Sequence, residues 1–263
     1  MQAWHEIPDE LFLNFDQTPL SYVCSSKHTL HPKGEKSVPL IGKGKQKQIT
    51  GTFACTMVGD FFPMQLIYEG ATDRCHPKGV EFPEGFNVTH SANHWSNEDR
   101  AAEHLEKVIF PYLTSKRETL GFQALQRALL IYDVFRGQMT PKIMALVEEN
   151  HCVMVPVPAN LTQHFQPLDL MINGMAKRFL KKKFEEWYAK QITDQLASGA
   201  DVYQIKVDLT LTKMKPIHAN WVIGLYDYLR NQRETIQKSF EQSGITDAVY
   251  GSIEGADPFE DLD

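Results

Sequence analysis

The sequence has few cysteines and no long apolar run. Its 263 residues include four cysteines and no Cys-x-x-Cys pair: Cys24, Cys55, Cys75 and Cys152. Such scattered cysteines predict free thiols in a reducing compartment rather than a disulfide framework. No apolar run reaches the roughly 18 residues of a membrane span, so none is expected. Residues 1–6 lack the basic start and the apolar stretch of a signal peptide.

The chain also lacks a positive net charge. The 27 Lys and Arg residues are outnumbered by 33 Asp and Glu residues, which gives a net charge of −6 and by itself disfavours a non-specific nucleic-acid binder. The distribution of charge is more informative than the sum. Residues 254–263 carry five acids and no base and are expected to be disordered, whereas basic residues gather at 33–47 and 177–183.

Apolar periodicity predicts alternating strands and helices over most of the chain. The expected order is β-β-β-α-β-α-β-α, followed by a further helical region at about 217–240. Residues 21–48 and 70–93 are polar or rich in Gly, Pro and His and are expected to be loops, and Ser96 opens a predicted capping box. The strands are expected at 11–15, 48–58, 62–68, 129–132 and 152–157, and the helices at about 99–113, 140–149 and 168–195.

Three aspartates follow apolar strands or open a helix. Asp16 and Asp133 end the runs 11–16 and 128–133, and Asp169 comes two residues after Pro167. Taken singly, each has an ordinary explanation as a turn, loop or helix N-terminal residue. Three converging carboxylates can hold two divalent cations about 4 Å apart, which is the arrangement used for in-line phosphoryl transfer.

These aspartates lie in segments that resemble three motifs of a known family, the DDE superfamily endonuclease domain of the pogo-, tigger- and jerky-like branch of mariner-type transposases. The resemblance runs from about Ile7 to about Tyr188. The segments are Phe15-Asp16-Gln17-Thr18, Tyr132-Asp133-Val134-Phe135-Arg136-Gly137-Gln138 and Gln166-Pro167-Leu168-Asp169.

The resemblance implies an α/β fold, namely a ribonuclease H-like mixed five-stranded sheet flanked by helices, with a C-terminal helical extension. The expected domains are a DDE endonuclease domain at 7–198, the helical extension at 199–250 and an acidic tail at 251–263. An N-terminal helix-turn-helix module, which full-length relatives use to find DNA, is absent from this chain.

The resemblance also implies that Asp16, Asp133 and Asp169 are the catalytic residues and the ligands of two Mg²⁺ or Mn²⁺ ions. In that reading Asp16 bridges both ions. Asp133 holds the ion that activates water or a DNA 3′-hydroxyl, and Asp169 holds the ion at the leaving oxygen. The chain departs from many relatives after the second aspartate, where Val134 replaces an Asn and Gly137-Gln138 stand near the usual His.

The implied partner is DNA, which implies a nuclear location and leaves a homodimer possible. Five basic residues beyond Asp169 are expected to contact phosphates, or else to form a solvated helix face. They are Lys177, Arg178, Lys181, Lys182 and Lys183. The same role is open to the basic residues of the first predicted loop, Lys33, Lys36, Lys43, Lys45 and Lys47.

Other function classes remain open. The main alternative is a domesticated, catalytically silent DNA-binding or chromatin protein of the centromere protein B or jerky type, and a phosphohydrolase with a small substrate is a third class. A zinc site at His28 and His31 or at Cys75-His76 is disfavoured because no paired ligand motif is present. Nucleophilic catalysis by Cys24 or Cys152 is disfavoured because no matching base motif accompanies them.

Overall fold

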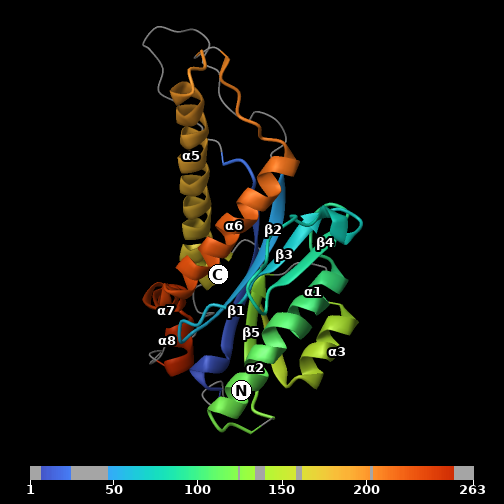
Figure 1. The fold of residues 1–263 in the computed structure, drawn as a ribbon. Coiled ribbons are helices and arrows are strands. Elements are labelled where there is room, and N and C mark those ends of the chain that lie inside the picture. Colours follow the sequence, from blue (N-terminus) through green and yellow to red (C-terminus); the bar gives the residue numbers. More distant parts are fainter. Residues whose placement is uncertain are drawn as a thin grey trace, which may run out of the picture.

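A mixed β-sheet with helices on both faces forms the centre of the protein (Figure 1). The structure, a computed structural model, describes residues 7–24, 47–123, 125–133, 140–157, 162–201 and 204–251. In this part of the chain the sheet has six strands. They are β1 Phe12–Ser21, β2 Gln48–Thr56, β3 Gln65–Glu69, β4 Asn87–Ser91, β5 Ala128–Asp133 and β6 Cys152–Val157.

The strand order β4-β3-β2-β1-β5-β6 is that of a ribonuclease H-like sheet with one added edge strand. Strands β1, β2 and β3 form an antiparallel meander, and β5 and β6 continue the sheet in parallel with β1. The predicted fold class is therefore confirmed, with one strand more than the predicted five. The added strand β4 lies inside the predicted loop 70–93 and pairs in parallel with all five residues of β3.

Two groups of helices cover the sheet (Figure 1). One face carries α1 Glu98–His104, which continues through the π-helical turn η4 Leu105–Ile109 into α2 Phe110–Thr119, and α3 Pro141–Glu149. The other face carries α5 Asn173–Ala197, α6 Leu211–Arg230, α7 Arg233–Gln242 and α8 Ile245–Tyr250. The short elements are η2 Asp9–Leu11, η3 Asp73–Cys75, α4 Thr162–Phe165 and the π-helical turn η6 Leu168–Ile172.

Local sequence explains most helix boundaries, with three differences from the prediction. The side chain of Asn97, rather than Ser96, caps α1 by accepting a 3.0 Å hydrogen bond from the backbone of Arg100. The helix that follows reaches Thr119 instead of about residue 113. The region predicted at 217–240 is two helices, α6 and α7, which are separated at residues 231–232.

The core lies on both sides of the sheet. Every residue of β2 after Gln48 is buried, which requires cover on both faces. The turn after β2 also joins the two helical layers, because Asp60 accepts a 2.7 Å hydrogen bond from Tyr112 of α2 and the turn packs on Arg233 of α7. Gly59 has φ 93°, and a Cβ there would lie 2.7 Å from the Arg233 carbonyl oxygen, so the turn needs glycine. None of the described helices has the length and apolarity needed to cross a membrane.

Candidate active site

Asp16 lies on an inner strand and faces η6 and α5. Its neighbour Phe15 pairs with Tyr132 of the parallel strand β5, and the two rings stack with centroids 5.7 Å apart on one face of the sheet. Because successive side chains of a strand point to opposite faces, Asp16 points to the other face. There its Oδ2 accepts a 2.6 Å hydrogen bond from Nδ2 of Asn173, the first residue of α5.

Asp133 is the last residue of β5 and lies beside Asp16. Since Phe15 is opposite Tyr132 in a parallel pair, the residues that follow them are neighbours and leave the same face. The positions after Asp133 at which the chain departs from the family motif, Val134 and Gly137-Gln138, lie outside the described residues.

Asp169 reaches the same place from the π-helical turn η6. Its Oδ1 accepts a 2.8 Å hydrogen bond from Nδ2 of Asn173, so one amide nitrogen bridges Asp16 and Asp169. Asn173 is itself buried, and its Oδ1 has no hydrogen-bond partner in the described part of the chain. The three predicted aspartates therefore come together, although Asp16 and Asp169 are 153 positions apart in the sequence. Asp16 was predicted to follow a strand at 11–15, but β1 runs on to Ser21, so Asp16 lies inside the strand.

The site carries uncompensated negative charge. Burial, together with the charge of Asp169 and, more weakly, that of Asp133, raises the pKa of the Asp16 carboxyl to about 7. Hydrogen bonds from Asn173 and from the backbone of Gln17 act in the opposite direction. A carboxyl with this pKa is stabilised as an anion by a bound cation.

The donor set consists of carboxylate oxygens, which Mg²⁺ and Mn²⁺ prefer. Among the described residues, the potential ligand atoms that all lie within 4.8 Å of one another belong to Cys75, His76 and His90. The oxygens of the three aspartates do not meet that spacing. In this structure the amide of Asn173 stands between two of the three aspartates.

Two asparagines that the sequence analysis did not single out build the site. Asn14 is buried, donates a 3.0 Å hydrogen bond to the carbonyl of Ile131 in β5 and accepts a 3.0 Å bond from the backbone N–H of Leu168 in η6. It thereby fixes the start of η6 against the two strands that carry Asp16 and Asp133. Their spacing from the aspartates could have identified them. Asn14 precedes Asp16 by two residues on a strand and Asn173 follows Asp169 by four residues on a helix, and both spacings place two side chains on the same face.

The predicted basic residues on α5 fall into two groups. Lys181, Lys182 and Lys183 form ion pairs of 3.7 to 3.9 Å with Glu185 or Glu186. Lys177 and Arg178 are exposed, lie one turn beyond Asn173 and have no ion-pair partner among the residues that the structure describes. Of the loop lysines, Lys47 is exposed, and Lys33, Lys36, Lys43 and Lys45 lie outside the described residues.

Sequence comparison finds relatives among pogo-derived proteins. No family model matches the chain. It is 28% identical over 175 residues to the human protein "Pogo transposable element with KRAB domain", a match that covers 66% of this chain and 27% of the relative. The mouse protein of the same name is 27% identical over 175 residues, with the same coverage. The chain thus spans about a quarter of the length of these relatives.

Among solved structures, the chain matches the "Crystal structure of a pre-cleavage Mos1 transpososome" with a TM-score of 0.45 and 12% identity, over 89% of this chain and 56% of that one. The sequence matches confirm the resemblance predicted from the acidic motifs, because the chain is similar to the pogo transposable element proteins over 66% of its length.

Proposed function

We propose that this chain is a DDE-type endonuclease domain that binds DNA and holds two divalent cations on Asp16, Asp133 and Asp169 for strand cleavage or strand transfer. The observation that carries the proposal is the convergence of three carboxylates, from β1, β5 and η6, on one face of a ribonuclease H-like sheet. The similarity to pogo transposable element proteins supports DNA as the partner and the nucleus as the location.

The residues present fit Mg²⁺ or Mn²⁺. All three candidate ligands are hard oxygen donors, and the raised pKa of Asp16 indicates that its anion lacks a positive partner. Bound ions would supply Lewis-acid stabilisation of the phosphate and of the attacking and leaving oxygens. Because phosphate and water complete the coordination of such ions, few protein ligands are needed.

The rest of the site has supporting roles. Asn173 orients Asp16 and Asp169 through its bridging amide, and Asn14 holds η6 against β1. Lys177 and Arg178 lie on the helix that leaves the site, where unpaired cations would attract DNA phosphates without reading the sequence. We expect a smaller contribution to DNA affinity from Lys181, Lys182 and Lys183, because glutamates already pair with them.

The proposal is tested by a nicking assay on labelled duplex DNA, with the domain joined to a DNA-binding module and given Mn²⁺. Asp133→Asn and Asp169→Asn keep size and hydrogen bonding but remove the charge that holds a hard cation. Each is expected to lower the nicking rate by about 10³-fold or more while the fold and DNA affinity survive. The matched control is Asp227→Asn, on the exposed side of α6, which is expected to leave the rate unchanged.

A second function is supported by the Asn173 bridge. An amide that links two carboxylates holds them in place without a metal, as a catalytically silent DNA-binding domain would require. That function predicts DNA binding with no nicking above the Asp133→Asn background at any Mn²⁺ concentration. The nicking assay therefore decides between the two functions.

A further inference from the structure

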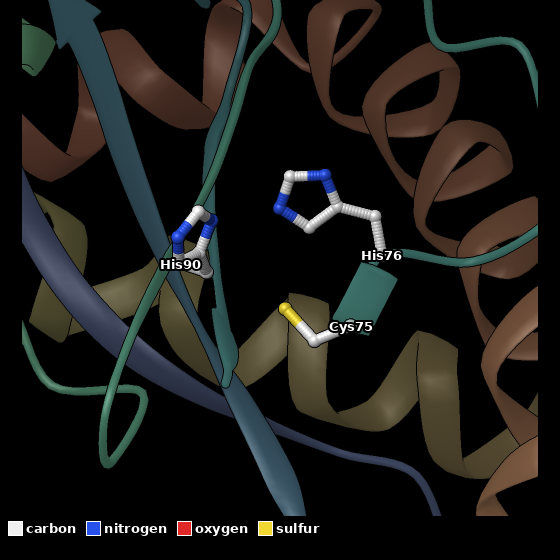
Figure 2. A group of neighbouring side chains, drawn as sticks. All are labelled: Cys75, His76 and His90. Carbon is white, nitrogen blue, oxygen red and sulfur yellow. The ribbon is translucent and has the colours of Figure 1, made fainter. Parts of the chain in front are cut away.

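A second group of potential metal ligands lies at the edge of the sheet that is formed by β4, far from β5. One ligand atom each from Cys75, His76 and His90 lies within 4.8 Å of the others (Figure 2). Cys75 ends η3 and His76 follows it directly, whereas His90 belongs to the edge strand β4. Strands β3 and β2 separate β4 from β1, so this cluster is distinct from the aspartate site.

The two imidazoles have nitrogens that lack hydrogen bonds. Nε2 of His76 and Nδ1 of His90 are buried without a hydrogen-bond partner in the ranges that the structure describes, although Nδ1 of His90 lies 3.3 Å from a carboxylate oxygen of Asp73. Figure 2 shows the His76 ring turned towards His90, with the Cys75 sulfur pointing into the space beside them. His76 also has a hydrogen bond with the backbone of Thr89, which is the kind of support that fixes a metal-binding imidazole.

A carboxylate stands at the rim of the cluster. Oδ1 of Asp73 lies 3.3 Å from Nδ1 of His90 and 3.9 Å from Nδ1 of His76, and the Asp73 side chain is otherwise exposed. Other ionisable groups near the cluster include Lys215 of α6, Arg100 of α1, which donates to the carbonyl of His90, and the buried Tyr68 of β3, whose ring is 5.5 Å from that of His76. A carboxylate beside metal-binding histidines raises their basicity and sets their orientation.

The backbone holds the thiol in place before any metal binds. A Cβ at Gly70 would lie 2.4 Å from Cβ and 2.8 Å from Sγ of Cys75, so only glycine permits this approach. Lys215 Nζ donates a 2.5 Å hydrogen bond to the carbonyl of Cys75, which ties the thiol-bearing turn to α6. Burial raises the pKa of the Cys75 thiol, although the charge of Lys215 acts in the opposite direction, so a bound metal would have to displace the thiol proton.

We propose that Cys75, His76 and His90 bind one zinc ion. One sulfur and two imidazole nitrogens are the donors that Zn²⁺ prefers, and its usual tetrahedral coordination leaves a fourth position for water. Asp73 supports His90 at Nδ1, which leaves Nε2 of that ring to bind the ion. The ion joins η3 to the edge strand β4 and, through Lys215, to α6, so it stabilises a segment with little apolar burial of its own.

The proposal is tested by metal titration of the full chain under excess Mg²⁺, which keeps the aspartate site from taking zinc. The wild-type protein is expected to bind one equivalent of Zn²⁺ with a Kd below about 1 μM and to melt at a higher temperature when loaded. Co²⁺ in place of zinc is expected to give a thiolate-to-cobalt charge-transfer band, which reports sulfur ligation directly.

The variants separate a metal site from a packed cluster of side chains. Cys75→Ser is expected to abolish the cobalt band, and both Cys75→Ser and His90→Gln to weaken zinc binding about 100-fold or more. Asp73→Asn is expected to weaken it about 10-fold. Cys24→Ser, which removes another incompletely buried thiol, is the control and leaves the band and the affinity unchanged.

Absence of zinc binding in the wild type, or an affinity that survives Cys75→Ser and His90→Gln, overturns the proposal. Circular dichroism of each variant shows whether it folds. If Cys75→Ser does not fold, the cobalt spectrum of the wild type still decides, because a bound ion without a thiolate band excludes Cys75 as a ligand.

Discussion

At the scale of single residues, the candidate site depends on one buried carboxyl whose charge is poorly balanced. Burial and the neighbouring charge of Asp169 raise the pKa of Asp16 to about 7, against an ordinary value of 3.8. The folded protein therefore binds this proton more tightly than the unfolded chain does. The contribution to stability is full below about pH 3.8 and is lost as the pH rises through about 7.

Asp16→Asn is accordingly expected to stabilise the metal-free protein near neutral and alkaline pH. The amide keeps the hydrogen bond from Asn173 and removes the buried charge, so the free energy of unfolding should rise by an amount on the order of 4 kcal/mol at about pH 8 and by about half as much at about pH 5. Urea unfolding at both pH values measures the difference. An Asp16→Asn protein that is less stable than the wild type at about pH 8 would contradict this explanation of the raised pKa.

At the scale of elements, the site depends on how η6 is attached to the sheet. The side chain of Asn14 makes one hydrogen bond to β5 and one to the first turn of η6, and both are buried. Asp169 is carried by that turn, so its position relative to Asp16 follows from Asn14 as well as from Asn173.

Asn14→Ala removes both hydrogen bonds and leaves the buried N–H of Leu168 unpaired. The expected loss of stability is about 2 to 3 kcal/mol, measured by chemical unfolding. Asn220→Ala, which removes an exposed amide bonded to the carbonyl of Pro216, is the control and is expected to cost less than about 0.5 kcal/mol. Equal losses for the two variants would mean that Asn14 does not anchor η6.

Much of the fold was predictable because its main strands are long and apolar. Asp16 and Asp133 were recognisable for the same reason, since each follows a buried run, although β1 continues past Asp16 to Ser21. Strand β4 was not predictable, because Asn87-Val88-Thr89-His90-Ser91 is short and polar and is held by parallel pairing with a distant strand. The bridging amide of Asn173 was missed because helical periodicity does not reveal the π-helical turn before it, and Cys75 and His90 meet only through the pairing of β3 with β4.

At the scale of the whole molecule, the net charge of −6 opposes the binding of DNA, which is itself negatively charged. DNA binding must therefore depend on a local basic surface. Among the α5 cations, Lys177 and Arg178 are the ones without a paired carboxylate in the described structure and also the ones nearest to Asn173. The aspartates and these two cations would then contact the same stretch of nucleic acid.

Lys177→Glu and Arg178→Glu are each expected to weaken DNA binding equally for all sequences and to lower the slope of log affinity against log salt by about 1. Lys182→Glu, whose cation is already paired with Glu186, is the matched control and is expected to have a smaller effect. Fluorescence anisotropy over a range of salt concentrations measures both quantities. If Lys182→Glu weakens binding as much as Lys177→Glu, the ion pairs do not decide which cations contact DNA.

The central claim is that Asp16, Asp133 and Asp169 share divalent cations, and direct Mn²⁺ binding to the folded domain tests it best. Calorimetric titration is expected to show two ions bound to the wild type and to the Cys75→Ser variant in the presence of a short duplex. Asp16→Asn is expected to lose both ions while it remains folded, because the charges of Asp169 and Asp133 both act on its carboxylate. Mn²⁺ binding that is absent from the wild type, or unchanged in Asp16→Asn, would contradict the account.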